Sequence, residues 1–174
     1  MYRLILLMGA LLLAVGVASA AVVTLPNETQ TTTFTATVSE QANVAVPAGV
    51  AFAVTNVSAS TASSAQSVSA TAIVLTNAKA LRVELQAIDT SFTAPTGGSV
   101  TWYCSDVSWN AATWTNGTGA SGTLTDSMYR KLNDTSANAA STATTNLVFT
   151  LAARATVDRA GAHTLFAEWK FSSF

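Results

Sequence analysis

The sequence predicts an all-β protein, a single antiparallel β-sandwich that is jelly-roll-like and carries a protruding N-terminal strand. Apolar and polar residues alternate with a period of two in about eight to nine short segments, the pattern of half-buried strands. Glycine, proline and asparagine separate these segments and predict turns. No segment has the 3.6-residue apolar period of a helix, and long connections in the middle of the chain favour crossings between two sheets over a simple meander.

Residues 1–20 are predicted to be a cleaved secretory signal peptide. A single charge at Arg3 precedes an apolar core at residues 4–17, and the sequence Ala-Ser-Ala fits a cleavage site between Ala20 and Ala21. An uncleaved membrane anchor is the alternative, but the run is shorter than the ~20 apolar residues that a span needs. A type IV pilin leader would need a basic-glycine processing site, which this stretch lacks. The interpretation predicts a secreted, extracellular protein with no membrane contact after cleavage.

Residues 21–39 are predicted to be a donor-strand segment, and residues 40–174 the β-sandwich domain. Hydroxyl and apolar side chains alternate in the segment, so an extended strand would have one apolar face. A free strand of this kind is an aggregation hazard unless something covers it, and we expect a neighbouring copy of the chain to do so. Pro26 and Asn27 separate two apolar groups, and either group could enter the neighbour. The candidate donor residues are Val22, Val23, Leu25, Phe34, Ala36 and Val38.

The remaining strands follow along the domain. The clearest is 81–87, where apolar residues alternate with Arg82 and Glu84. Residues 147–157 and 165–171 are predicted to pair as a long antiparallel hairpin around a turn at 158–161. Further strands are expected at residues 43–46, 50–54, 68–74 and 100–104, a strand or a helical turn at 124–132, and loops at 55–67, 106–122 and 136–144.

The composition predicts a neutral surface and excludes a nucleic-acid partner. Only 10% of the residues are charged, against about 25% in an average soluble protein. Serine, threonine, alanine and valine replace them, which predicts a neutral, hydroxyl-rich surface suited to dense packing against other copies and to lateral bundling of filaments. A nucleic-acid partner would require a basic stripe, which the sequence lacks.

The sequence offers little catalytic chemistry, and we expect no enzyme activity, no metal and no cofactor. Its single histidine, His163, excludes the zinc motif with two histidines. A thiol nucleophile pairing Cys104 with His163 has no local support. Glu84 and Glu168 both lie on outward strand faces beside basic residues, so solvated cross-strand charges are favoured over a glycosidase pair.

Cys104 and four glycosylation sequons are the remaining candidate modification sites. Flanked by aromatic and apolar residues, Cys104 is interpreted as a core residue, with an intermolecular disulfide as the alternative. Four Asn-x-Ser/Thr triplets in loop-like contexts of an exported chain predict N-glycans. The candidate acceptors are Asn27, Asn56, Asn116 and Asn133.

Trp109 and Trp114 support an alternative function. Set among asparagines and glycines, the two rings could form a stacking platform of a monomeric, secreted carbohydrate-binding module. Aromatic residues beside a turn more often cap the end of a β-sandwich core, and we favour that interpretation.

Three stretches carry a resemblance to a known family. They are residues 46–50, residues 106–110 continuing to 115–119, and residues 160–165 followed by Trp169. With them, the chain resembles the secreted β-sandwich subunits of archaeal bundling pili and threads, relatives of the TasA/camelysin biofilm-matrix proteins. The resemblance covers essentially the whole mature chain through turn and core patterns.

The resemblance implies a jelly-roll-like fold that lacks one strand. The N-terminal strand of each subunit would fill the groove of the next by donor-strand complementation, giving a homopolymer that serves adhesion and biofilm cohesion. Camelysin relatives have been called metalloproteases, but this chain lacks the ligands, and that activity is not expected here.

Overall fold

The computed structural model describes residues 31–137 and 141–174. The chain divides into two units, Met1–Thr37, of which residues 31–37 are described, and Val38–Phe174. The predicted signal peptide with its Ala20–Ala21 cleavage site lies outside the described residues, as do the candidate donor residues Val22, Val23 and Leu25 and the sequon at Asn27. All the strands described below belong to the second unit.

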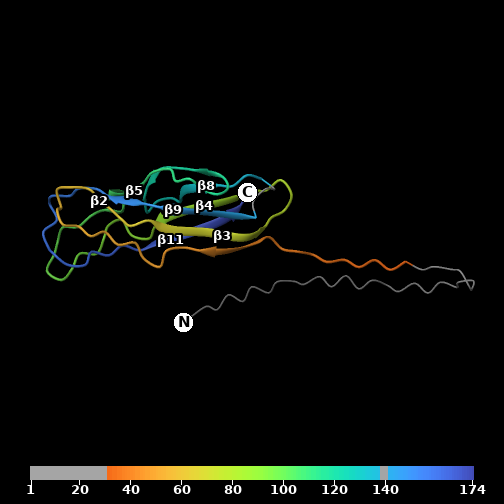
Figure 1. Ribbon diagram of the computed structural model, residues 1–174. Coiled ribbons are helices and arrows are strands. Elements are labelled where there is room, and N and C mark those ends of the chain that lie inside the picture. Colours follow the sequence, from red (N-terminus) through yellow and green to blue (C-terminus); the bar gives the residue numbers. More distant parts are fainter. Residues whose placement is uncertain (1–30, 138–140) are drawn as a thin grey trace, which may run out of the picture. The chain divides into compact units, whose positions relative to one another are not determined.

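The second unit is built from antiparallel strands, which confirms the predicted all-β class (Figure 1). A single 3₁₀ turn, Cys104–Asp106, is the one helical element among the described residues. The strands are β1 (Gln41–Ala45), β2 (Thr61–Ala62), β3 (Gln66–Val74), β4 (Leu81–Ala87), β5 (Val107–Trp109), β6 (Thr118–Gly119), β7 (Gly122–Thr123), β8 (Arg130–Asp134), β9 (Thr142–Leu147), β10 (Phe149–Leu151) and β11 (Ala167–Ser173).

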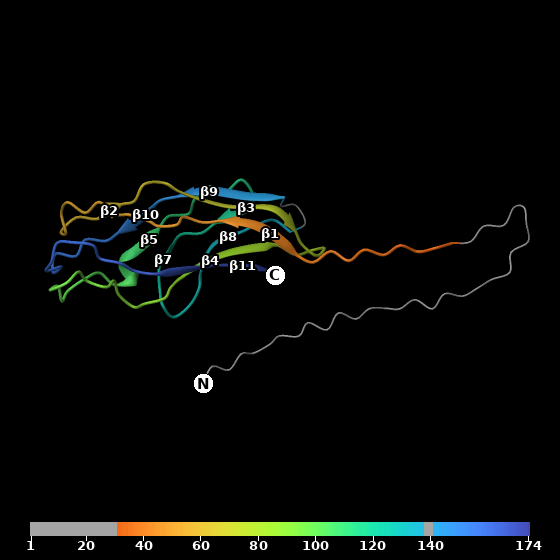
Figure 2. The same cartoon turned by 90° about the horizontal axis from the view of Figure 1, so that it is seen from below.

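The strands form three sheets around a shared apolar core. Their orders are β1-β3-β9, β2-β10-β5-β7 and β11-β4-β8-β6, and every pairing is antiparallel. Figure 2 shows β1 and β3 on one side of the unit and β4 and β11 on the other. Inward-facing residues of all three sheets, among them Val68, Val83 and Phe149, join one cluster. Whether the arrangement is a jelly roll stays a prediction.

Strand β4 lies at the centre of this core and confirms the strand predicted at 81–87. Its odd-numbered residues are buried and its even-numbered residues are partly exposed. Arg82 on the outer face pairs with Asp134 of β8, Nε to Oδ1 at 2.7 Å, and Glu84 pairs with Lys170 of β11 at 3.3 Å. The alternation seen in the sequence therefore reports the two faces of this strand correctly.

Strand β3 departs from its predicted pattern because its backbone changes phase. Val68 and Ala70 are buried, as their alternation predicts, but Ala72 has a positive φ of 49°. The pairing of β1 with β3 is irregular at this point. Ile73 then turns into the core, while Val74 is exposed. The alternation in the sequence predicts that Val68, Ala70, Ala72 and Val74 share one face, and this is wrong for Ala72 and Val74, because a bulge of this kind reverses the faces of a strand.

The predicted hairpin of 147–157 with 165–171 was also wrong. Strand β11 pairs with β4 along its whole length, whereas β10 pairs with β2 and β5. Trp169 and Phe171 lie opposite Leu85 and Val83, so the largest inward side chains of β11 pack beside those of β4. Residues 152–166 connect the two strands without regular strand structure. The strand expected at 100–104 is replaced by an isolated bridge and the 3₁₀ turn, and strands interrupt the loops predicted at 55–67, 106–122 and 136–144.

Glu40 fixes the position at which the chain enters β1. Its Oε1 accepts a hydrogen bond from the Thr76 backbone N–H at 2.9 Å, and its Oε2 accepts one from the Ser173 hydroxyl. These contacts lower the pKa of Glu40 to about 2, with the Ser173 hydroxyl as the largest cause. The start of β1 is therefore held beside the end of β11.

The core packing predicts the effect of truncating Leu132, which is fully buried in β8. Leu132→Ala should lower the free energy of unfolding by about 2–5 kcal/mol, because it removes apolar contacts and leaves a cavity. Ile88→Ala is the control, since the Ile88 side chain is largely exposed and surface changes of this kind stay within about 0.5 kcal/mol. Urea unfolding followed by tryptophan fluorescence measures both; equal losses would contradict the core assignment.

Candidate functional site: an open apolar groove

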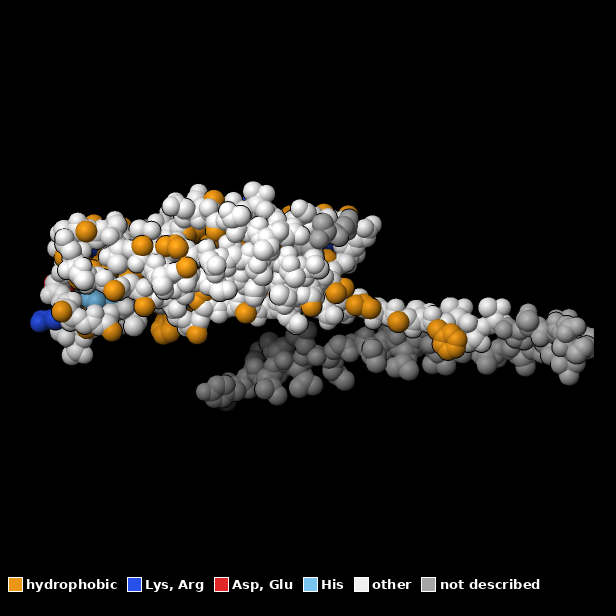
Figure 3. Space-filling view, viewed as in Figure 1, with side chains coloured by type: hydrophobic (Ala, Val, Ile, Leu, Met, Phe, Trp, Pro, Cys, Tyr) orange, Lys and Arg blue, Asp and Glu red, His pale blue; other side chains and the backbone are white. Residues whose placement is uncertain are grey.

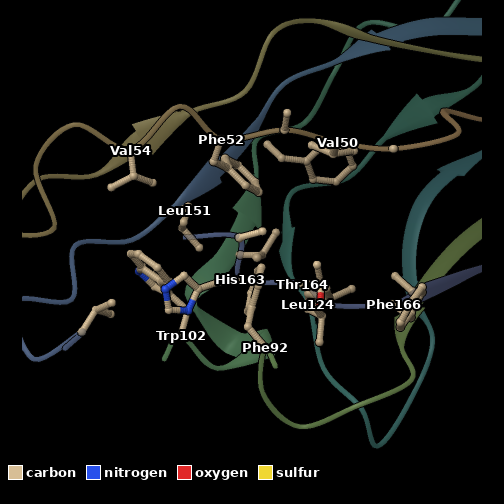
Figure 4. A pocket seen from close by; sticks show the side chains of 18 of the residues that line it. Val50, Phe52, Val54, Phe92, Trp102, Leu124, Leu151, His163, Thr164 and Phe166 are labelled. Atoms are coloured by element: carbon tan, nitrogen blue, oxygen red, sulfur yellow. The ribbon is translucent and has the colours of Figure 1, made fainter. Parts of the chain in front are cut away.

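An open groove of about 920 Å³ runs along one side of the second unit. Residues 47–57 form one wall and residues 157–167 the other, and the floor is apolar, with Leu85, Leu124 and Phe149. Figure 4 shows Val50, Phe52 and Val54 on one wall facing Phe92, Trp102 and His163 across this space. Val50 is exposed and Phe52, Val54, Phe92 and His163 are partly exposed in this groove, whereas Trp102 and the floor residues are buried.

The first wall has backbone groups without partners. Among the described residues, the N–H and C=O groups of residues 47–55 make no hydrogen bond to any other group. Pairing resumes at Asn56, whose C=O accepts from Ala59, and at Val57, whose C=O accepts from Arg154. The strand predicted at 50–54 therefore has the inward-facing side chains of a strand but lacks the neighbouring strand that would pair with it.

The second wall is paired on one side only. The Thr164 N–H and C=O both bond Thr93, at 3.1 and 2.7 Å, and the Phe166 C=O accepts from Ile88 at 2.9 Å. Hydrogen-bonding direction alternates along an antiparallel strand, so Leu165 and Ala167 direct their N–H and C=O groups the other way, toward the groove. Strand β11, which continues this wall, is the edge strand of its sheet. Both walls thus offer strand edges to the groove.

The uncovered surface continues from the groove toward β1. Val44 lies opposite Ala70 in the register of β1 and β3, and therefore on the inward face. Ala70 is fully buried, yet Val44 is 48% exposed. An inward-facing valine with this exposure means that the core lacks cover along the β1 edge, next to the first wall of the groove.

His163 is fixed in the second wall by two hydrogen bonds. Its Nε2 lies 2.9 Å from the Arg159 carbonyl oxygen and must donate, because a carbonyl only accepts. Its Nδ1 lies 2.8 Å from the Thr101 hydroxyl, which donates to it in the neutral ring. The ring packs edge-to-face on Trp102 with centroids 5.2 Å apart. Both ring nitrogens are occupied without Cys104, so the structure gives no support to a thiol–imidazole pair.

Asp158 holds the turn at one end of the second wall. Its carboxylate accepts hydrogen bonds from the Ser99 hydroxyl at 2.7 Å, the Ser99 N–H and the Val100 N–H. These bonds, the Ser99 hydroxyl first, lower the pKa of Asp158 from 3.8 to about 2. The loop before Trp102 is thereby tied to the turn that leads into the groove wall.

The described donor candidates are exposed. Phe34 is 93% exposed and Val38 is 70% exposed, and Ala36 between them is exposed as well. Residues 31–40 have no regular secondary structure, and Figure 3 shows apolar side chains projecting from the segment before β1. The prediction that a neighbouring copy covers the apolar side chains of this segment stays a prediction.

The sequons differ in accessibility. Asn56 is exposed, and its Oδ1 accepts from the Ser58 N–H at 2.9 Å. Asn116 is partly exposed and accepts from the Ser136 N–H at 3.3 Å. Asn133 is 0% exposed, and its amide nitrogen donates to the Asn116 carbonyl at 3.1 Å. The prediction of Asn133 as a glycan acceptor conflicts with this burial, because the folded state has no room for a sugar there.

The tryptophans and the cysteine are core residues. Trp109 and Trp114 are both buried, and Trp109 Nε1 donates to the Ala120 carbonyl at 3.0 Å. Neither ring offers an exposed stacking face, so the suggested carbohydrate platform is not formed by these residues. Cys104 is buried as well, and desolvation raises the pKa of its thiol. That burial leaves no room for an intermolecular disulfide.

Sequence reasoning did not identify the groove. Phe92, Trp102 and His163 come together from three segments, and their apolar or aromatic character alone predicts core packing. The one available signal was the strand pattern at 50–54 with no evident pairing partner.

Comparisons with known proteins found no match: no family model matches the chain, and neither does any curated protein or solved structure. Among residues 31–137 and 141–174, no group of three or more histidine, cysteine, aspartate or glutamate residues is placed to bind a metal ion. No helix in that part of the chain is long and apolar enough to cross a membrane.

The Asp158 contacts predict a loss of stability in acid. A carboxyl whose pKa is lower in the folded than in the unfolded state stabilises the fold above its unfolded pKa of ~3.9, and this contribution disappears as the pH falls toward about 2. Ser99→Ala removes the largest cause and should raise the pKa of Asp158 and reduce the pH dependence of unfolding between about pH 4 and 2. NMR titration of the carboxyl with urea unfolding at each pH tests this; an unchanged titration would contradict it.

Proposed function

We propose that the chain is the structural subunit of an extracellular filament and polymerises head-to-tail by donor-strand complementation. In this assembly the segment preceding β1 of one copy lies in the groove of the next copy. Such a filament would serve adhesion and cell-cell cohesion, as a bundling pilus or a biofilm-matrix fibre does. No catalytic step is involved.

One observation carries the proposal: the groove has unpaired strand edges on both sides. Residues 47–55 have no backbone partner among the described residues, and the edge at Leu165 and Ala167 faces the same space. A small ligand could satisfy the apolar floor, but only an extended chain can satisfy two rows of backbone groups. The chain supplies such a segment itself, with Phe34 and Val38 exposed on one face.

The energetics favour occupation of the groove. Burying a large apolar side chain stabilises by ~1.5–3 kcal/mol, and Phe34 and Val38 would each contribute an amount of this order. Backbone hydrogen bonds to both walls add specificity and remove the cost of burying unpaired groups. The contact is heterologous, because the donor and the acceptor are different surfaces, so it extends into a filament and does not close as a two-fold dimer.

The outer face of β3 and β9 supports lateral contacts between filaments. The register of these strands places hydroxyl and amide side chains side by side on it, without a charged residue. Such a face can approach a second copy without charge repulsion or the desolvation of ions. Its residues are Ser67, Ser69, Thr71, Thr142, Thr144 and Asn146.

The proposal is tested by placing a charge on each face of the donor segment. Phe34→Asp should raise the critical concentration for fibre assembly by roughly ten- to hundredfold or more, because the anchor is lost and a carboxylate would have to be buried. Thr35→Asp carries the same charge on the opposite face and should assemble nearly as well as the unaltered protein. Sedimentation and negative-stain microscopy of the full mature chain measure both.

Two outcomes would contradict this assignment. Fibres of unaltered yield from Phe34→Asp would show that the segment does not enter a groove. Equal impairment by Thr35→Asp would show that charge alone, and not the apolar face, controls assembly.

Glycan mapping provides a second test of the secreted assembly. We expect glycans that the folded filament carries at described sequons to lie on Asn56 or Asn116 and none to lie on Asn133, whose side chain is buried. Mass spectrometry of peptides from native filaments measures the occupancy of each sequon. A glycan on Asn133 would contradict the packing of β8.

A further inference from the structure

We propose a specific register for the incoming strand, resting on the donor-strand function proposed above. Residues 34–38 of one copy run antiparallel to residues 163–167 of the next. Val38 lies opposite His163, Ala36 opposite Leu165 and Phe34 opposite Ala167. The Phe34 ring fills a notch in the groove wall between Leu165 and Trp169.

The direction follows from where the chain leaves the domain and where the groove opens. Glu40 bonds Ser173, so the start of β1 lies beside the end of β11. One wall of the groove begins at Pro47, beyond the end of β1, and the other leads into the first residues of β11, with Ala167 and Trp169 lining the groove. The two features therefore lie at opposite ends of the β1–β11 side of the domain. In a head-to-tail repeat the donor enters with Val38 nearest the mouth and runs in the direction of β1, antiparallel to β11.

The faces of the strands restrict the register to steps of two residues. Leu165 and Ala167 direct their backbone groups into the groove, and Leu165 packs against the core. Ala87, the cross-strand partner of Ala167, is buried and gives its N–H to Thr125, away from β11. Residues that face each other in such pairs share one face of the sheet. Phe34, Ala36 and Val38 must therefore oppose odd-numbered residues, because a shift by one would bury threonines.

Side-chain size then selects one of the remaining registers. Ala167 and its partner Ala87 are both small and lie between the larger Leu165 and Trp169, which leaves a notch, and Ala167 is exposed although it faces inward. The proposed register places the large Phe34 at this notch and the small Ala36 against Leu165. A shift by two in one direction sets Phe34 against Leu165, and in the other against Trp169. Both crowd large side chains and leave the notch empty, and each is disfavoured for packing.

Disulfide trapping tests the register on the full mature chain. Ala36→Cys is combined with Leu165→Cys, with His163→Cys or with Ala167→Cys. Facing residues lie ~5.5 Å apart at Cα, within disulfide range, whereas diagonal neighbours lie about 7–8 Å apart. Only A36C/L165C should give a thiol-sensitive ladder of covalent oligomers on denaturing gels after mild oxidation. The native Cys104 is buried and does not contribute.

The outcomes separate the register from the function. A ladder from A36C/H163C or A36C/A167C would overturn the register and leave the donor-strand function standing. Fibres without a ladder from any of the three pairs would overturn docking in this groove, and with it the register. Absence of fibres from the unaltered chain would overturn the proposed function itself.

A size exchange keeps the register testable if Leu165→Cys does not fold. Phe34→Ala should lower the assembled fraction by about tenfold or more, and Ala167→Phe, which fills the notch, should do the same. The double variant F34A/A167F should recover assembly, because the ring is then supplied by the acceptor. F34A/A36F keeps the composition of the donor but places the ring against Leu165, and should not recover. Recovery by F34A/A36F, or failure of a folded F34A/A167F, would overturn the register.

Discussion

Unpaired backbone along the two walls of the groove is the constraint on which the rest of the structure depends. A buried amide or carbonyl without a partner costs on the order of 1–3 kcal/mol, so native chains rarely leave a strand's length of such groups unpaired. Here residues 47–55 remain exposed enough for water to satisfy them, while Phe52 and Val54 still pack against the core. The domain therefore contains a groove with unpaired backbone along its walls, and the edge strand β11 borders it through Ala167 and Trp169.

The sequence predicted which way side chains face more reliably than which strands pair. Periodicity at 81–87 and 50–54 identified the inward residues correctly, because alternation is a local property of an extended chain. Pairing is decided by tertiary contacts, and the alternation in 147–157 and 165–171 is compatible with many partners. The structure pairs β11 with β4, where large side chains pack together and Lys170 meets Glu84. The phase change at Ala72 was equally unpredictable, since nothing in its neighbours requires a positive φ.

The groove itself could not be predicted, because its walls and floor come from segments that lie far apart in the sequence. Phe92, Trp102 and His163 have no spacing relation in the sequence and meet only after the chain has crossed between sheets. The proposed donor segment, by contrast, is suggested by the sequence itself, since residues 31–39 combine strand periodicity with no charge to keep them soluble. In the proposed assembly the apolar segment of one copy would fill the groove of another. Either feature left uncovered would be an aggregation hazard.

Glu40 fixes where the segment before β1 leaves the domain relative to β11 and therefore relative to the groove. By bonding both Thr76 and Ser173, it fixes the point at which the segment before β1 leaves the domain, beside the end of β11, whose other end borders the groove. Val38 lies three positions before Gln41, the first residue of β1, which is a span of ~10 Å in extended chain. In the proposed filament a donor seated in a neighbour would therefore leave little free linker, and successive domains would nearly abut. Short linkers raise the effective concentration of every later contact between the same two domains. Glu40 thus sets where the segment before β1 emerges, and in the proposed filament Phe34 would set how deeply that segment is held.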